Sequence, residues 1–281
     1  MRVLRSYATL VFLFLYAPIA VIVVFSFSAG HSASDFHGFS LQWYATAAGN
    51  RFVKDALVHS LIIAAASSAL ATVVGTAAAL VLPRIRGPFR VVFDALTYVA
   101  IMVPGIVIGI ATLIALVTAF EVLNPTLAAL WPGDPAASPQ LHMGLGSVIL
   151  AHSVFATALV IMLVRARLLG MDRSLLEASS DLYATPWGTF RQVTLPMILP
   201  AVIAGFLLSF TFSLDDYVVA SFVAGPTVTL PIYIFASVRR GVTPEINAIG
   251  TVVLSVSLLL LFGSLLLLRR GQRAGAATSK A

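Results

Sequence analysis

The chain has 281 residues, of which 59% are hydrophobic and 10% charged, and its mean hydropathy is +1.00. This composition is typical of a polytopic membrane protein and argues against a globular, water-soluble one. There is no cysteine, so disulfides, thiolate metal sites and thiol catalysis are excluded.

Hydrophobic stretches long enough to cross a bilayer recur along the whole chain. A spanning helix needs about 18 apolar residues or more, and the short alternating strands of a barrel do not occur. We therefore expect an all-α, polytopic membrane protein that forms a single transmembrane domain over residues 1–281, with a disordered tail at 271–281. The six expected spans are 7–27, 56–82, 91–120, 145–164, 197–214 and 248–268.

The net charge of +6 follows a topological pattern. With the N-terminus inside, all but four of the 17 Lys and Arg residues fall in cytoplasmic segments; the exceptions are Arg51, Lys54, Arg239 and Arg240. Cytoplasmic loops of membrane proteins are enriched in Lys and Arg. Both termini are therefore expected in the cytoplasm, and no nucleic-acid partner is expected.

Three features inside the spans bear on the structure. Pro104-Gly105 is expected to kink or loosen the third span. Asp94, near the inner end of that span, is expected to form a structural ion pair with Arg86 or Arg90. His152 in the fourth span is expected to be a packed histidine, with a role in proton transfer as the alternative.

The longest polar interruption between spans is segment 172–196, DRSLLEASSDLYATPWGTFRQVTLP. A short loop would be enough to reverse the chain here. The segment instead combines small residues around Ala178 with acids at Glu177 and Asp181, in a pattern that suits a short helix. Small residues allow close approach of another backbone, and exposed acids can meet a basic groove. We interpret the segment as a cytoplasmic docking helix for a partner.

Asp215 and Asp216 follow directly after the fifth span. Its 18 residues already cover most of the hydrocarbon thickness, at a rise of about 1.5 Å each, and apolar sequence resumes after the two acids. A carboxylate at this depth is expected to face a cavity or a partner, where it would attract a cationic amine. The alternative is an interfacial pair that meets Arg239 or Arg240.

The docking segment carries a family resemblance. Glu177-Ala178-Ser179, Tyr183 and Val193-Thr194-Leu195-Pro196 resemble the EAA motif of binding-protein-dependent ABC transporter permeases. That motif reads Glu-Ala-Ala, three residues, Gly, nine residues and Ile-x-Leu-Pro. The spacing matches throughout, but Ser179 replaces the second Ala and Tyr183 replaces the Gly. The resemblance implies a helix that couples to the ATPase subunit through Glu177, Ala178, Ser179, Asp181, Leu182 and Tyr183.

Other stretches resemble the permeases of spermidine/putrescine transporters in particular. They are Phe39-Ser40-Leu41-Gln42-Trp43-Tyr44, Ser213-Leu214-Asp215-Asp216-Tyr217 and Thr243-Pro244-Glu245-Ile246-Asn247-Ala248. The resemblance implies the permease of a type I ABC importer in a bacterial-type inner membrane, with a polyamine as the expected solute. An aminoalkylphosphonate or an opine is the alternative. The candidate substrate path is Asp215, Asp216, Tyr217 and Glu245.

Two rival classes explain the sequence less well. An ion-coupled secondary transporter would leave the docking helix without a role. HExxH, GxSxG and G-x-x-x-x-G-K-[ST] are all missing, so neither an enzyme nor the ATPase itself is indicated. The resemblance implies a pair of ABC ATPase subunits that bind ATP and Mg, a second permease subunit, a periplasmic or lipid-tethered solute-binding protein, and membrane lipid. We expect no metal or cofactor in this chain.

Overall fold

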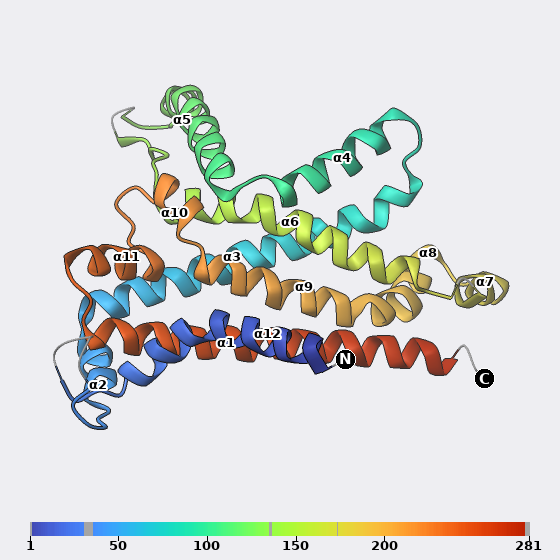
Figure 1. Cartoon of the computed structure of the whole chain (residues 1–281). Helices are drawn as coiled ribbons and strands as arrows, with labels where there is room; N and C mark the ends of the chain where they lie inside the picture. The colour runs from blue at the N-terminus through green and yellow to red at the C-terminus, as the bar shows by residue number, and fades with distance from the viewer. Residues whose placement is uncertain (1, 31–35, 135–136, 173, 279–281) are drawn as a thin grey trace. The chain divides into compact units, whose positions relative to one another are not determined.

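The computed structural model describes residues 2–30, 36–134, 137–172 and 174–278. Within these ranges the regular secondary structure is helical, apart from one isolated bridge between Ser28 and Phe39 (Figure 1). The expected all-α class is therefore confirmed. The chain divides into two compact units, Met1–Val58 with Leu230–Leu258 and His59–Thr229 with Leu259–Ala281. We call them the first and the second unit.

The first unit is held together at the junction of its short helices. Its helices are α1 (Arg2–Phe25), α2 (Gln42–Gly49), the start of α3 (Arg51–Val81), α11 (Leu230–Arg240) and the start of α12 (Pro244–Thr278). Asn50 accepts the Phe52 N–H at 3.0 Å and donates to Glu245 Oε1 at 3.0 Å and to the Tyr233 hydroxyl at 3.2 Å. A small apolar core lies beside this junction: Ala47, Val53, Ala56, Leu230 and Ile249.

The second unit is built around one buried helix. Its further helices are η1 (Leu82–Arg84), α4 (Pro88–Met102), α5 (Gly105–Leu130), α6 (Leu145–Leu169), α7 (Ser174–Asp181), α8 (Pro186–Thr189), η3 (Phe190–Thr194), α9 (Leu195–Asp215) and α10 (Val218–Val223). Helix α6 is the most buried of the long helices and runs between α4 and α9 (Figure 1). Gly75 of α3 lets α6 approach closely, because a Cβ there would lie 2.9 Å from the Val160 side chain.

Six helical segments are long and apolar enough to cross a membrane, as the sequence predicts. They are Leu4–Phe25, Arg51–Arg84, Gly105–Leu130, Leu145–Leu169, Pro186–Asp215 and Pro244–Leu266. The first, second, fourth and sixth lie within about five residues of the expected bounds at each end, whereas the fifth begins at Pro186 instead of 197. Further differences concern the third span and the C-terminal end.

The expected third span, 91–120, is two helices rather than one. Val103 and Pro104 are extended, with ψ of 132° and 138°, and α4 and α5 diverge from this point (Figure 1). A residue before proline avoids the helical region, and proline offers no N–H to continue the helix. Helix α4 is about 22 Å long, shorter than the roughly 30 Å hydrocarbon core. The helix of spanning length is therefore α5, which ends at Leu130, ten residues beyond the expected end at 120.

Helix α12 continues to Thr278, through most of the tail that we expected to be disordered. Arginine, glutamine and alanine after Leu268 are good helix formers and extend the apolar helix. Residues 279–281 lie outside the described part of the chain.

Candidate functional site

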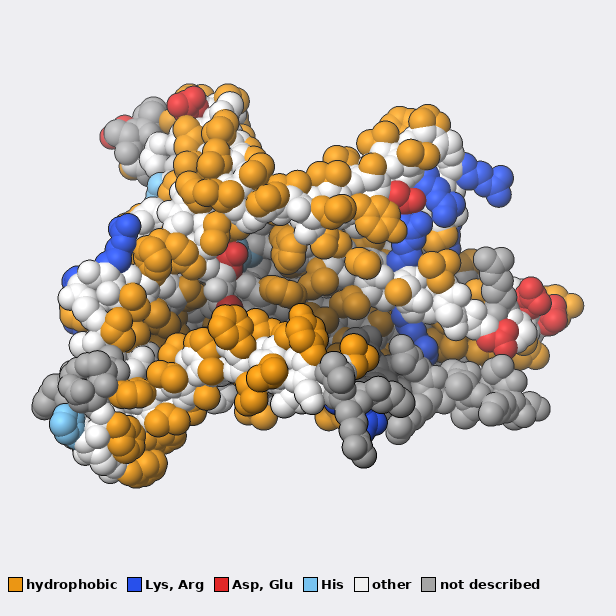
Figure 2. All heavy atoms as spheres, viewed as in Figure 1, with side chains coloured by type: hydrophobic (Ala, Val, Ile, Leu, Met, Phe, Trp, Pro, Cys, Tyr) orange, Lys and Arg blue, Asp and Glu red, His pale blue; other side chains and the backbone are white. Residues whose placement is uncertain are grey.

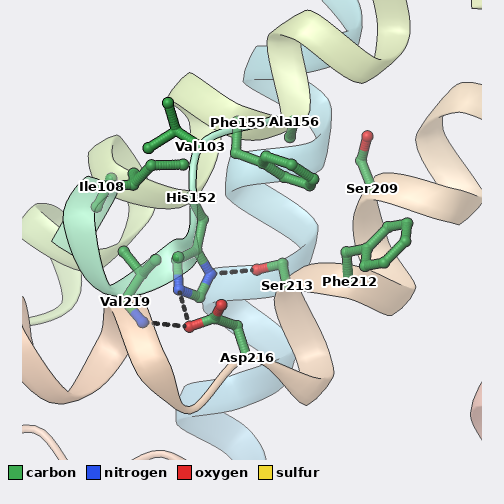
Figure 3. Close-up of a pocket in the computed structure, with 12 residues that line it drawn as sticks. Val103, Ile108, His152, Phe155, Ala156, Ser209, Phe212, Ser213, Asp216 and Val219 are labelled. Carbon is green, nitrogen blue, oxygen red and sulfur yellow. Dashed lines mark hydrogen bonds and ion pairs between the residues drawn. The ribbon is translucent and has the colours of Figure 1, made fainter. Parts of the chain in front are cut away.

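A cavity of about 210 Å³ opens in the second unit, against α6, the end of α9 and the start of α5. Figure 3 shows side chains from these elements converging on it. His152 and Asp216 are the ionisable groups among its lining residues. The lining is otherwise apolar or hydroxylated: Val103, Gly105, Ile108, Ala151, Phe155, Ala156, Ser209, Phe212, Ser213 and Val219.

The end of α9 brings Asp216 to this cavity. Residue Asp215 closes the helix, and Asp216 is extended, with ψ of 116°. Its Oδ1 accepts the N–H groups of Val219 at 2.8 Å and Ala220 at 3.1 Å, which caps α10. The apolar sequence after Asp216 is thus a short helix folded back on the unit rather than a continuation of the span. The Asp216 side chain remains 28% exposed.

Helix α10 is held by close contacts on both sides. A Cβ on Gly109 of α5 would lie 2.6 Å from the Phe222 ring, so only glycine fits there. At the other end, the buried Ser147 hydroxyl of α6 lies 2.6 Å from the Val223 carbonyl oxygen. These contacts fix the helix that Asp216 caps, and so fix the carboxylate itself.

His152 connects Asp216 to two other helices. Its side chain is only 4% exposed, and its Nε2 lies 3.5 Å from Asp216 Oδ1. Its Nδ1 is 2.7 Å from the Ser213 hydroxyl, which accepts a hydrogen bond from Ser67 at 3.0 Å. A row of polar groups thus runs from α3 through α9 and α6 to the carboxylate. Figure 3 shows the part of it from Ser213 through His152 to Asp216.

This arrangement suits a small cation. A carboxylate in an apolar cavity attracts positive charge, and aromatic rings attract it as well. The rings of Phe155 and Phe212 lie edge to face, 5.9 Å apart, and both line the cavity. The buried Ser209 hydroxyl has no hydrogen-bond partner among the described residues and also lines the cavity. No group of three or more potential metal ligands occurs in the described part of the chain.

The four residues of the expected substrate path are divided between the two units. Asp216 faces the cavity, whereas Asp215 is exposed at the end of α9 and Tyr217 is half-buried before α10. Glu245 lies in the first unit, where Asn50 holds it. The alternative partners of the acids also lie in the first unit: Arg239 packs over the Phe235 ring and Arg240 donates to Ser237.

Sequence reasoning gave too little weight to His152 and did not single out Ser213 or Ser67. The signal available was that each of three largely apolar helices carries buried polar side chains. Spacing along the chain does not reveal that the three meet, because they are separated by 61 and 146 positions.

The docking segment forms a compact helix with a defined end. Asp172 Oδ1 accepts the Ser174 N–H at 3.0 Å, and hydrogen bonds from Ser174 hold the pKa of Asp172 below its usual value. At the other end, Ala184 N–H donates to Ser179 O and Tyr183 N–H to Ser180 O, at 3.1 and 2.9 Å. This pair of bonds is a Schellman motif, with Tyr183 in the left-handed position at φ 56°. The family motif has its Gly at this position.

Most of the residues expected to couple are exposed. Acidic side chains gather at the end of the unit that carries α7 (Figure 2). Ser179 differs, because it is buried and its hydroxyl contacts Thr189 Oγ1 at 2.8 Å. Its small size serves packing within the chain rather than close approach of a partner. The exposed members are Glu177, Ala178, Asp181, Leu182 and Tyr183.

The docking segment connects directly to the cavity. Helices α8, η3 and α9 form one helical run, Pro186–Asp215. Its first turn contains Thr189, the contact of Ser179, and it ends at the cavity. The Thr185 hydroxyl caps its start by accepting the Gly188 N–H at 3.1 Å. The run widens to a π-helix at η3, which ends two residues before Pro196. Proline offers no N–H and crowds the carbonyl four residues earlier, which accounts for the wider turn.

Asp94 forms the expected ion pair with Arg90, at 3.9 Å, and has a second partner that we did not expect. Arg165 of α6 binds both of its carboxylate oxygens. The ion pair therefore joins α4 to α6. A neighbour on α6, Arg167, donates to the Met197 carbonyl at 2.9 Å and joins α6 to α9.

Comparison with known proteins places the chain in a family. The model for the inner membrane component of binding-protein-dependent transport systems matches residues 71–273. The chain belongs to this family. It is 40% identical over 246 residues to the putrescine transport system permease protein PotI of Escherichia coli K12, covering 86% of this chain and 82% of that protein. It is 34% identical over 270 residues to the spermidine/putrescine permease protein PotC of the same strain, covering 95% of each.

Solved structures show the same fold. A chain of a bacterial ABC transporter that imports the acidic polysaccharide alginate superposes with a TM-score of 0.70, at 16% identity over 96% of each chain. A chain of the MetNI methionine ABC transporter gives 0.52 at 19% identity, over 81% of this chain and 98% of that one. This member of the family is a multi-pass membrane permease and not an enzyme.

Proposed function

We propose that this permease forms the membrane path for a polyamine, such as putrescine or spermidine, in an ATP-driven importer. The names of its relatives PotI and PotC support this class of solute. The observation that carries the proposal is Asp216, a carboxylate fixed at the wall of a largely apolar cavity. A solute with cationic ends and an apolar middle matches such a wall.

The proposed contacts follow from the geometry. An ammonium group at Asp216 meets a carboxylate whose Oδ1 is already held by two N–H groups, so Oδ2 faces the solute. The Phe155 and Phe212 rings flank the apolar chain or the charge. In this proposal Asp215 and Tyr217 act at the mouth of the cavity, and Glu245 attracts the cation elsewhere along the path.

The proposed energy source is a partner. An ATPase subunit pair, which binds ATP and Mg, contacts α7 through Glu177 and Asp181 together with the exposed Leu182 and Tyr183, which are 80% and 96% exposed. Its closure moves α7, and the helical run Pro186–Asp215 carries that movement to Asp216. A second permease subunit completes the path, and a solute-binding protein delivers the polyamine from outside. The distribution of Lys and Arg supports termini in the cytoplasm.

The test is uptake of labelled putrescine by cells that lack their own polyamine importers, with and without this chain and its partners. We expect uptake that requires the chain, is inhibited by unlabelled spermidine, and is lost in Glu177→Lys. Glu177 is exposed, so this change leaves the fold intact and reverses one charge on α7. Absence of putrescine and spermidine uptake by the wild type would refute the solute. Uptake that persists in Glu177→Lys would refute the coupling role.

A further inference from the structure

We infer that Ser67, Ser213 and His152 form a relay that fixes one tautomer of His152 and thereby positions Asp216. In this tautomer the imidazole proton is on Nε2 and points at the carboxylate. The relay makes His152 a positioning residue for the solute-binding carboxylate; the identity of that solute rests on the proposed function, whereas the tautomer does not.

The relay starts at Ser67, which is fully buried on α3. Its hydroxyl has two acceptors within reach, the Ala64 carbonyl at 3.4 Å and the Ser213 oxygen at 3.0 Å. The shorter contact is the stronger hydrogen bond, so Ser67 gives its proton to Ser213. A hydroxyl has one proton and two lone pairs, so the proton of Ser213 remains available for another acceptor.

That acceptor is the Nδ1 of His152, 2.7 Å from the Ser213 oxygen. In a neutral imidazole one ring nitrogen carries the proton and the other accepts. Among the described residues the Ser213 hydroxyl contacts only Ser67 and Nδ1, and because Ser67 donates, Nδ1 is the acceptor left for the Ser213 proton. The ring proton is therefore on Nε2.

Nε2 is buried and lies 3.5 Å from Asp216 Oδ1. This separation is longer than an ordinary hydrogen bond, so the N–H dipole orients the carboxylate without saturating it. The Val219 and Ala220 N–H groups hold the same oxygen. All the contacts of the carboxylate with described residues are thus on Oδ1, and Oδ2 remains for a donor that arrives from the cavity.

The neighbouring Ser68 is a matched control for Ser67. It is equally buried on the same helix, but its hydroxyl bonds the carbonyl of its own helix, Ala64 O, at 2.6 Å. Ser67→Ala and Ser68→Ala therefore remove the same atom from the same helix. The first breaks the relay and the second leaves it intact.

The direct test measures the tautomer in the assembled transporter in lipid nanodiscs, by nitrogen NMR with labelled histidine. The chain has five histidines, and the His152 signals are identified by their loss in His152→Gln. We expect the Nε2–H tautomer in the wild type and in Ser68→Ala, and a mixture of both tautomers in Ser67→Ala. A wild-type signal from the Nδ1–H tautomer, or a spectrum of Ser67→Ala that matches the wild type, would overturn the relay.

The functional test compares two replacements of His152. Glutamine places an amide N–H near the position of Nε2, whereas asparagine reaches only the position of Nδ1. We expect His152→Asn to lower the maximal putrescine uptake rate about tenfold, because the carboxylate loses the N–H dipole that orients it, while His152→Gln stays within about threefold of the wild type. The KM is expected to stay unchanged, because the solute-binding protein captures the solute first.

The two tests separate the two proposals. If the wild type imports no polyamine, the proposed function fails, and the NMR spectra still decide the relay. If polyamine is imported and the two His152 variants have equal rates, His152 does not position Asp216.

Discussion

Asp216 illustrates how one residue can have two structural partners and still be available to a third. Its Oδ1 caps α10 and faces His152, and its side chain keeps part of its surface in the cavity. The adjacent Asp215 has the same charge but is exposed at the end of α9. The two acids, indistinguishable by their place in the sequence, are therefore expected to have different roles.

We predict that Asp216→Asn lowers the rate of putrescine uptake by at least about tenfold, the scale of one hydrogen bond to a charged group. The amide oxygen of asparagine can still accept the Val219 N–H, so the cap on α10 is preserved while the charge is removed. Initial uptake rates check this, with co-purification of the partner subunits as the control for assembly. Asp215→Asn should have a smaller effect. Equal rates for Asp216→Asn and the wild type would contradict the role of the carboxylate.

Tyr183 is the residue whose departure from the family motif has a clear structural cost. It occupies the left-handed position of the Schellman motif, where a side chain costs about 1 kcal/mol relative to glycine. Its side chain is 96% exposed, so packing does not offset this cost.

Tyr183→Gly is therefore predicted to stabilise the end of α7 by about 1 kcal/mol. The measurement is hydrogen exchange of the amides in Ser174–Ala184, which should slow in this variant. Tyr183→Ala is the control, because it removes the aromatic ring but retains a Cβ at positive φ, and it should give no protection. Equal slowing of exchange in both variants, relative to the wild type, would show that the ring, and not the backbone conformation, sets the stability here.

At the scale of elements, the apolar runs predicted the helices well and their interruptions less well. The six spans are visible in the sequence because each is a long apolar run. The break at Pro104 was expected as a kink and is a complete separation of α4 from α5. The return of the chain after Asp216 as α10 was ambiguous, because a six-residue apolar run suits a buried loop helix or the end of a span equally well.

The contacts between elements were beyond prediction for a physical reason. The relay joins positions 67, 152, 213 and 216, and only tertiary packing brings these together. The docking helix was predictable, because its polar character contrasts with its surroundings and its motif spacing is local. Its exposed residues agree with expectation, and the exception is Ser179, which packs against Thr189.

Helix packing gives a prediction at this scale. Gly75 on α3 faces Val160 and the Thr157 carbonyl of α6, and a Cβ would approach them to 2.9 and 3.0 Å. We predict that Gly75→Leu lowers stability by roughly 1–3 kcal/mol through overpacking. Thermal unfolding of the purified protein in detergent checks this against Gly146→Ala, a position on α6 with open space around it. Unchanged stability of Gly75→Leu would mean that the two helices separate easily.

At the scale of the whole molecule, the uneven distribution of Lys and Arg predicts the orientation in the membrane. The sequence contains no cysteine, so a single introduced cysteine provides a unique thiol for labelling. Gly133→Cys, in the loop after α5, and Ala184→Cys, beside α7, both introduce a thiol at an exposed position. These two thiols should lie on opposite sides of the membrane.

In intact spheroplasts, a membrane-impermeant maleimide is predicted to label Gly133→Cys and not Ala184→Cys. After permeabilisation both should react, which controls for accessibility. The reverse pattern would place α7 outside and would be incompatible with a cytoplasmic ATPase.

The cap that Asp216 provides for α10 has a further consequence for the transport cycle. A cation that binds Oδ2 shares one carboxylate with the Val219 and Ala220 amides on Oδ1, and so affects the acceptor on which their hydrogen bonds depend. Occupancy of the cavity and the order of the first turn of α10 are therefore thermodynamically linked, and each biases the other. The first turn of α10, a helix with no ionisable side chain of its own, thus responds to whether a cation occupies the cavity.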